Sequence, residues 1–354
     1  MSISNVFLAQ EQHLDREISY LKKSIIYPKA WLIYTSENKL IWDYFTSLPP
    51  GVNTTRALQV FACLHEKEQL AAFHDSLLAI KAKLFISGEF FLLGSTSNYF
   101  HYVYDVLPRL FFWLEVDKIK SYNAIVDVKT NSSNDAFQNQ WLNLLEIDNQ
   151  KLISIHEKLP TIIDGKLACP HVRKDLRYGD SHGSKYFLIC YLRELVNRRI
   201  LLGLNSINHF SRIFISRKDG STRLEAIVEA ERIAIKHGYS IIYSEEHTVK
   251  QQLSIFKSAQ IIIGLSGAGM ANCLFARKST LIRIIVNAKD VTHVSPKNVG
   301  WAKINDSRFK VPEYQYYARY LKYLGYDIKC VSFPENKSDF SNRFSTFLRE
   351  LNYY

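Results

Sequence analysis

The sequence predicts an α/β fold with two helix-covered sheets, and three observations support this prediction. Residues 212–285 switch repeatedly between an apolar period of two and a period of about 3.6, the pattern of strands alternating with helices. Residues 122–169 show the same alternation. A glycine-rich turn at residues 266–269 joins an apolar strand to a short helix. Strands connected through helices pair in parallel with right-handed crossovers, so each stretch predicts a doubly wound sheet.

The longer stretch contains predicted strands and helices in strict alternation. The strands are residues 212–216, 239–243, 260–264 and 281–286. The helices are residues 223–237, 248–257 and 270–275. Together they form a βαβαβαβ unit, which predicts one parallel sheet.

The glycine turn is the candidate phosphate site of this unit. Gly267 and Gly269 leave backbone N–H groups unshielded at the start of the helix 270–275, and a helix N-terminus attracts anions. A nucleotide is therefore the expected ligand. The alternative is that the glycines only allow the backbone to turn.

Three interpretations of the turn compete. A dinucleotide fingerprint needs a third glycine or alanine where Asn272 stands, although Asp290 lies near the spacing of a ribose ligand. A hydrolase nucleophile elbow needs Gly-x-Ser-x-Gly, and the run that begins at Gly264 ends with Ala268. The third interpretation is a sugar-nucleotide site, which the rest of the stretch supports.

Residues 98–115 form the second informative stretch. In a helix that begins near Asn98, the side chains of Asn98, His101 and Asp105 lie on one face and can converge. Pro108 is expected to kink or end this turn, and residues 110–114 continue as an apolar wall. His101 beside a carboxylate is a candidate catalytic base, with a core histidine as the alternative.

The remaining elements suggest two domains. We expect an N-terminal domain at residues 1–180, a C-terminal domain at 181–337, and a segment at 338–354 whose helix can cross back to the first domain. A turn-rich linker is expected near residues 170–183. The other predicted strands are residues 122–128, 152–155 and 161–169, and the other predicted helices are residues 135–145, 186–204, 314–324 and 340–351.

The charge balance points to anionic partners. The 354 residues carry a formal net charge of +11. Such a surface favours phosphorylated substrates or an anionic membrane surface. The aromatic stripe in residues 314–324 fits packing against a neighbouring domain better than base stacking, so no nucleic-acid partner is expected.

Cysteine usage and the N-terminal sequence indicate a compartment. The five cysteines are scattered, which is typical of free thiols in a reducing environment. The N-terminal residues show no basic lead-in before an apolar core, so no signal peptide is expected. We therefore expect a cytoplasmic protein, peripheral at the inner membrane.

Several motifs in these stretches occur together, in the same order, in one known family. The chain resembles the family 61 glycosyltransferases over roughly residues 88–326. The upstream block that carries the resemblance is Asn98, His101, Asp105, Leu107 and Pro108. The downstream residues are Ile215-Ser216-Arg217, Arg223, Glu229, Glu231, Glu246, Gln252, Gly264, Gly267-Ala268-Gly269, Asn272 and Phe275. Three positions depart from the family pattern: Ser266 stands for a histidine, Arg283 for a glutamate and Val228 for an asparagine.

The resemblance implies a fold, a reaction and a set of site residues. It implies the GT-B architecture, two Rossmann-like domains facing across a cleft, and inversion at the anomeric carbon. It assigns catalysis to His101 and Asp105, and places Asn98 and Arg109 on the acceptor side. Donor binding falls to Arg217, Arg223, Glu246, Gln252, Ser266, Gly267, Ala268, Gly269 and Asn272.

We therefore predict an inverting hexosyl- or pentosyltransferase that uses a nucleoside-diphosphate sugar, with a UDP-sugar as the expected donor. The acceptor is a glycan or lipid-linked glycan of capsule or lipopolysaccharide synthesis. No metal or other cofactor is expected, because the chain contains no Asp-x-Asp motif. The alternatives are a non-catalytic sugar-nucleotide-binding homologue and a nicotinamide-dependent or hydrolytic enzyme.

Overall fold

The computed structural model divides the chain into two compact units. The first comprises residues 1–139 and 147–174, and the second comprises residues 140–146 and 175–354. Both are mixed α/β, which confirms the predicted fold class. The structure describes residues 18–27, 32–35, 40–42, 84–96, 98–127, 136–155, 159–170, 184–203, 210–218, 227–287, 316–333 and 337–352.

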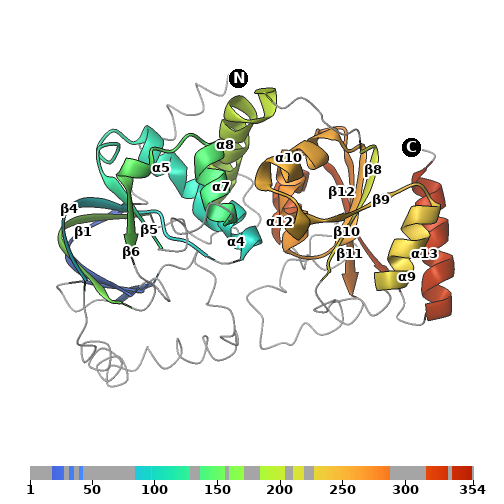
Figure 1. Ribbon diagram of the computed structural model, residues 1–354, viewed down its shortest axis with the longest axis horizontal. Helices are drawn as coiled ribbons and strands as arrows, with labels where there is room; N and C mark the ends of the chain where they lie inside the picture. Colours follow the sequence, from blue (N-terminus) through green and yellow to red (C-terminus); the bar gives the residue numbers. More distant parts are fainter. Residues whose placement is uncertain are drawn as a thin grey trace. The chain divides into compact units, whose positions relative to one another are not determined.

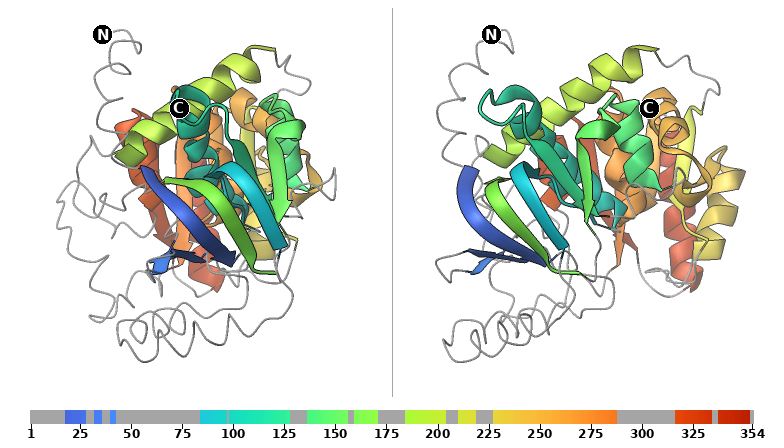
Figure 2. Two further views of the ribbon diagram at one scale, coloured as in Figure 1. Left: turned by 90° about the vertical axis from the view of Figure 1, so that its left-hand side faces the viewer. Right: turned by 60° about the vertical axis from the view of Figure 1, so that its left-hand side comes forward.

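The first unit contains a seven-stranded mixed sheet in the order β3-β2-β1-β7-β4-β5-β6. Strands β7, β4, β5 and β6 are parallel, whereas β1, β2 and β3 pair antiparallel with their neighbours. Figure 2 shows β1 in blue, β7 in green and β4 in cyan running side by side. The bounds are β1 Ile18–Tyr27, β2 Leu32–Thr35, β3 Leu40–Trp42, β4 Leu84–Leu92, β5 Asn123–Asp127, β6 Leu152–Ile155 and β7 Thr161–Pro170.

The antiparallel half of this sheet corrects the expectation of a second, purely doubly wound sheet. Only residues 28–31 separate β1 from β2, and a parallel connection needs a crossover of a dozen residues or more. The short connection therefore forces these two strands to pair antiparallel. The parallel half contains the three strands that the sequence predicts, at 122–128, 152–155 and 161–169, within a residue at each end.

The helical stretch of the first unit begins after β4 and changes its hydrogen-bonding pattern three times. It starts as α4 (Tyr99–His101), becomes a π-helical turn (Tyr102–Val106), then a 3₁₀ turn (Leu107–Arg109), and continues as α5 (Leu110–Glu115). Pro108 stands at the start of the 3₁₀ turn, where a missing N–H is tolerated, so the helical path continues. The helix expected to begin near Asn98 is therefore present, with a π-turn and a 3₁₀ turn in its interior, and the chain stays helical beyond Pro108.

The second unit contains a five-stranded sheet in the order β12-β11-β10-β8-β9, in which all pairings are parallel. The four strands predicted from residues 212–286 are confirmed. Sequence periodicity missed β12, which begins directly after the turn at Gly325. The bounds are β8 Arg212–Ser216, β9 Ser240–Tyr243, β10 Ile261–Leu265, β11 Leu281–Asn287 and β12 Asp327–Phe333.

Helices cover both faces of this sheet. Figure 1 shows α9 and α13 on one face and α10 and α12 on the other. The helix bounds in this unit are α8 Ser184–Arg199, α9 Ile227–Lys236, α10 Val249–Ser258, α12 Tyr316–Tyr323 and α13 Lys337–Leu351. Helix α7 (Phe137–Leu144) begins in the first unit, and its residues from 140 onward belong to the second. The arrangement is a three-layer doubly wound fold.

The C-terminal helix α13 packs within the second unit, which corrects the expectation that it crosses back to the first. Its apolar face is fully buried against the sheet and α9. Phe344 contacts the rings of Phe214 and Phe333 at centroid distances of 6.0 and 5.3 Å. An amphipathic helix packs where its apolar stripe can be buried. Residues of β8 and β12 bury the apolar stripe of α13.

Two further expectations concern the chain as a whole. None of the helices in the described ranges is long and apolar enough to cross a membrane. Among the described residues, Cys169, Cys190, Cys273 and Cys330 are not joined in disulfides, while Cys63 and most of the predicted linker, residues 171–183, lie outside the described residues.

Candidate functional site

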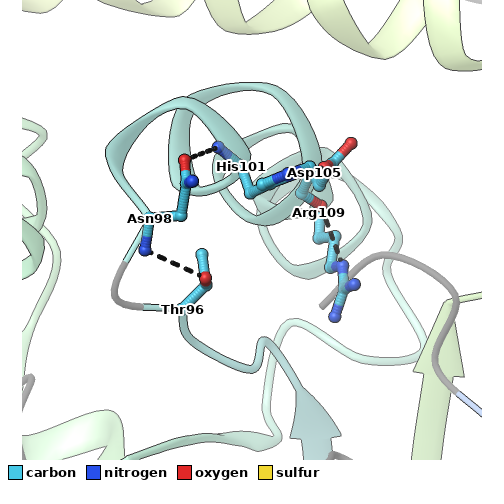
Figure 3. A network of polar contacts seen from close by, with 5 residues as sticks. All are labelled: Thr96, Asn98, His101, Asp105 and Arg109. Carbon is cyan, nitrogen blue, oxygen red and sulfur yellow. Dashed lines mark hydrogen bonds and ion pairs between the residues drawn. The ribbon is translucent and has the colours of Figure 1, made fainter. Parts of the chain in front are cut away.

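The first group of candidate residues lies where the chain leaves β4 and enters the helical stretch (Figure 3). Thr96 Oγ1 accepts a hydrogen bond from the backbone N–H of Asn98 at 3.1 Å. The side chain of Asn98 is the N-cap of α4, because its Oδ1 accepts from the backbone N–H of His101 at 3.3 Å. Asn98 therefore fixes where the helix begins, and its role toward an acceptor stays a prediction.

The π-helical turn brings His101 and Asp105 together. His101 Nδ1 and Asp105 Oδ2 are 2.6 Å apart, the distance of a strong charge-assisted hydrogen bond. The Asp105 side chain is 6% exposed and the His101 side chain 33% exposed. Single π-turns inside helices are frequent at functional sites, because they displace side chains from the regular helical positions.

Arg109 holds this turn from beneath. Its side chain is fully buried, its Nε donates to the carbonyl oxygen of Asp105 at 3.0 Å, and its Nη1 donates to that of Leu93 at 3.0 Å. Figure 3 shows the guanidinium pointing away from His101. These contacts position the loop and the turn, and the acceptor-side role of Arg109 stays a prediction.

The His101–Asp105 pair has the geometry of a general base with an orienting carboxylate. An ionised carboxylate only accepts hydrogen bonds, so the Nδ1 of His101 carries the proton that faces Asp105. The neutral ring then keeps the lone pair of Nε2 free to accept a proton. The exposure of His101 gives a substrate hydroxyl access to that atom.

The second group of candidate residues lies at the carboxyl edge of the sheet in the second unit. The chain runs from β8 to β9 on one side of β8 and then crosses to β10 on its other side, so a topological switch point lies between β8 and β10. Ligands of open α/β sheets bind at such a point, outside the carboxyl ends of the strands. Ser216 and Arg217 end β8, and Ser266 and Gly267 follow β10. The sheet order thus brings the predicted Arg217 and glycine turn together.

Arg217 lies directly over the glycine turn. A Cβ atom built on Gly267 would stand 2.0 Å from Arg217 Nη2, so only glycine lets the guanidinium approach this closely. The 3₁₀ helix Ala268–Phe275 begins here, and Gly269 Cα faces Ile215 and Ser244. A guanidinium beside exposed backbone N–H groups at a helix start is a composite anion site.

Two hydroxyls at this edge have unused hydrogen-bonding capacity. The Oγ atoms of Ser266 and Ser244 are buried and have no partner among the described residues. A Cβ on Gly269 would lie 3.5 Å from Ser244 Oγ, which places that hydroxyl against the glycine turn. An unpaired buried hydroxyl costs about 1–3 kcal/mol, so a bound ligand that satisfies these groups would gain affinity.

Gln252 and Asn272 connect the segments around the glycine turn. Gln252 Nε2 donates to the carbonyl oxygens of Ser244 and His247, at 2.8 and 2.9 Å. Asn272 Nδ2 donates to Gln252 Oε1 at 2.7 Å, and Asn272 is fully buried. The amides therefore connect α10, the end of β9 and the 3₁₀ helix, and their part in donor binding stays a prediction.

A second polar network joins β8, β9 and α9. Ser216 Oγ donates to Glu231 Oε1 at 2.5 Å, and Glu231 is also hydrogen-bonded to Tyr243. Burial raises the pKa of Tyr243, and the Glu231 carboxylate raises it further. Lys218 forms an ion pair with Glu246, which is exposed, and its backbone N–H donates to Glu245 at 2.8 Å. Arg223 lies outside the described residues.

The charge-reversed position Arg283 lies away from the glycine turn. Arg283 is opposite Ile263 in the sheet, and its Nη1 donates to Asp327 Oδ1 at 2.9 Å, at the amino end of β12. The Ser266 N–H, by contrast, binds the carbonyl oxygen of Ile285, two residues further along β11. Arg283 is therefore a structural ion pair at the other end of the sheet.

The comparison with known protein families agrees with this geometry. The family model described as glycosyltransferase 61 matches residues 99–283, just over half of the chain. The chain belongs to glycosyltransferase family 61. No curated protein matches the chain. The family match begins at the helix of His101 and ends in β11, so it includes every candidate residue from His101 to Asn272, and it confirms the family resemblance.

Three residues of this glycosyltransferase site were missed as candidates from the sequence. They are Ser244, which follows β9, Lys218, which lies just beyond the end of β8, and Glu231, which accepts a hydrogen bond from Ser216 at the end of β8. The signal that could have identified Ser244 and Lys218 is their position directly after predicted strands of a parallel sheet. Glu231 is one turn into a predicted helix, and its contact with Ser216 required the tertiary structure.

Proposed function

We propose that this glycosyltransferase moves a sugar, with inversion, from a nucleoside-diphosphate sugar, with UDP as the expected nucleotide, to a glycan or lipid-linked glycan acceptor. The observation that carries the donor assignment is the contact of Arg217 with Gly267 at the switch point of the parallel sheet. A diphosphate needs a delocalised cation and backbone donors in one place, and this edge supplies both.

The proposed chemistry divides between the two groups of residues. The acceptor oxygen attacks the anomeric carbon as the bond from that carbon to the diphosphate oxygen breaks. His101 Nε2 takes the acceptor proton, and Asp105 stabilises the imidazolium that results. Arg217 and the N–H groups after Gly267 neutralise the leaving diphosphate. A single displacement of this kind inverts the anomeric centre.

The wider assignments remain proposals that the resemblance motivates. We propose that the two units are the domains of a GT-B enzyme and that the acceptor belongs to capsule or lipopolysaccharide synthesis in a bacterium. The net charge of +11 supports a cytoplasmic enzyme that is peripheral at an anionic membrane face. The alternative, a non-catalytic sugar-nucleotide binder, requires that His101 and Asp105 have no chemical task.

A nucleotide panel tests the donor class. We expect UDP to raise the melting temperature of the full chain in proportion to ln(1 + [UDP]/Kd), and NAD to leave it unchanged. Product formation from the stabilising nucleotide's sugar and a matched acceptor then separates an enzyme from a binder. Stabilisation by NAD without stabilisation by any nucleoside diphosphate would contradict the proposal.

Metal independence is the second expected property of the reaction. The chain lacks an Asp-x-Asp motif, and Arg217 with the turn amides is placed to neutralise the diphosphate. The transfer rate is therefore expected to be unchanged in excess EDTA, measured as product formed at saturating donor. A rate that collapses in EDTA and returns with added Mn²⁺ would show that a metal does this task.

A further inference from the structure

A pair of cations lies at the amino edge of the sheet in the second unit, opposite the glycine turn. Lys278 is in the turn that precedes β11, and Tyr326 directly precedes β12. Arg193 reaches them from α8. Because β8 to β12 are all parallel, the starts of β11 and β12 lie at the edge of the sheet remote from the carboxyl ends that form the candidate donor site.

Both cations share the ring of Tyr326. Lys278 Nζ lies 4.5 Å from the ring centroid and Arg193 Cζ lies 5.6 Å from it. Arg193 Nε donates to Tyr326 Oη at 3.0 Å, and that hydroxyl also contacts the carbonyl oxygens of Leu274 and Ala276 at 2.7 and 3.0 Å. The tyrosine is thus fixed, and its ring is the common contact of the two cations, which are close enough for the charge of Arg193 to act on Lys278.

No described residue compensates these two charges. On the same helix, by contrast, Arg198 Nε donates to Glu194 Oε1 at 2.7 Å. Neither Arg193 nor Lys278 forms an ion pair with any described carboxylate. Burial and the charge of Arg193 lower the pKa of Lys278 to about 8. Holding a like-charged pair together is unfavourable until an anion joins it.

The other titratable groups that face the pair are neutral at pH 7. Burial raises the pKa of the Cys190 thiol and of the Tyr326 hydroxyl, and it raises the pKa of Tyr186 to about 12. The Cys273 thiol beside Tyr326 is buried, which also raises its pKa. The described surroundings therefore provide two positive charges and no negative one.

We propose that Arg193 and Lys278 form a binding site for a phosphate-type dianion, distinct from the donor site. The Nη atoms of Arg193 have no partner in the described part of the chain, and a guanidinium fork matches two oxygens of such an anion. Lys278 adds a point charge and is exposed, so the anion has access from solvent. The phosphate belongs either to a lipid headgroup or to a free phosphorylated metabolite.

The solution test observes Lys278 directly. The full-length protein is labelled with ¹³C-dimethyl groups on its lysines, and the Lys278 signal is assigned by its loss in Lys278→Gln. Sulfate is the probe because it stays a dianion from about pH 6 to about pH 10, the range over which Lys278 is titrated. The charge of phosphate changes within this range. We expect sulfate to shift this signal and raise the Lys278 pKa, while the exposed Lys236 signal on α9 stays unchanged.

The pH dependence and a variant sharpen this test. Sulfate affinity should fall as the pH rises through about 8, because deprotonation removes the Lys278 charge. Arg193→Gln should abolish the sulfate response and raise the Lys278 pKa towards that of an ordinary lysine. Arg193→Lys keeps the charge and should preserve most of the response. A Lys278 signal that ignores millimolar sulfate at pH 7, or responds equally in Arg193→Gln, would overturn the site.

A vesicle assay distinguishes the two sources of the phosphate. If a headgroup is the ligand, Lys278→Gln should reduce sedimentation with phosphatidic acid vesicles about tenfold more than the matched charge change Lys236→Gln. Equal sedimentation of the two variants, together with the sulfate response in solution, assigns the site to a free phosphorylated compound. Equal sedimentation without a sulfate response rejects the site altogether. None of these outcomes depends on the proposed glycosyl transfer.

Discussion

Replacement of His101 by alanine is expected to lower kcat by about two to four powers of ten while leaving nucleotide affinity nearly unchanged. The reason is that His101 contacts the reacting hydroxyl in the proposed mechanism, whereas the diphosphate is held by the second unit. Steady-state rates with a matched acceptor, and calorimetry with UDP, measure the two quantities. The ring is only partly buried, so its removal should leave the fold intact.

The variant Asp105→Asn is the matched test of the pair. If Asp105 only orients His101, the amide should lower kcat by less than His101→Ala does, since the imidazole can still accept a proton. A larger loss than in His101→Ala would make Asp105 the base itself. A melting curve for each variant is needed, because Asp105 lies in a buried turn. Parent-like turnover in His101→Ala, or unfolding of that variant, would contradict the assignment.

Replacement of Gly267 by valine is expected to abolish nucleotide binding, seen as loss of the UDP signal in calorimetry. A Cβ at this position would stand 2.0 Å from Arg217 Nη2 and 3.0 Å from Arg217 Cζ. These atoms are the far end of the flexible Arg217 side chain, so the guanidinium should move off the turn and the unit should stay folded. The first unit should remain folded.

Two other glycines provide the controls for this prediction. Gly203→Val introduces the same side chain where no atom of the described residues lies within 4 Å of the added Cβ, and UDP binding should be that of the parent. Gly264→Ala, by contrast, meets Met270 Sδ at 2.4 Å and Ile215 Cβ at 2.8 Å inside the core, so it should lower stability by about 1–3 kcal/mol. Unchanged UDP affinity in Gly267→Val would place the diphosphate elsewhere.

The fold of the second unit was largely predictable because its elements carry strong local signals. Strands such as Ile261–Leu265 are short apolar runs that are buried on both sides, and α10 begins at a capping box of Thr248 and Gln251. β12 was missed because it follows an aromatic helix through a short turn and has no clear period of two. Its strand character depends on pairing with β11, a contact distant in sequence.

Some features of the candidate site were likewise predictable from the sequence, and others required the tertiary structure. The sequence pattern alone identified the family, the α/β class, the glycine turn with Arg217, and the pairing of His101 with Asp105, because each is encoded by neighbours within a few residues or by a motif order. The tasks of Arg109, Gln252 and Asn272 were decided by the tertiary structure. Their partners are backbone carbonyls and amides brought close by folding, and no local spacing records such contacts.

Long-range contacts also explain why the surroundings of two positively charged features could not be inferred from the sequence. Arg283 looked like a change in the donor site, yet its partner Asp327 is 44 residues away and lies at the amino edge of the sheet. Arg193 and Lys278 are far apart in the sequence, and only the tertiary structure brings both of them to the ring of Tyr326. Local sequence determined what each segment becomes, whereas the side-chain environment that gives a charge its function was decided by long-range packing.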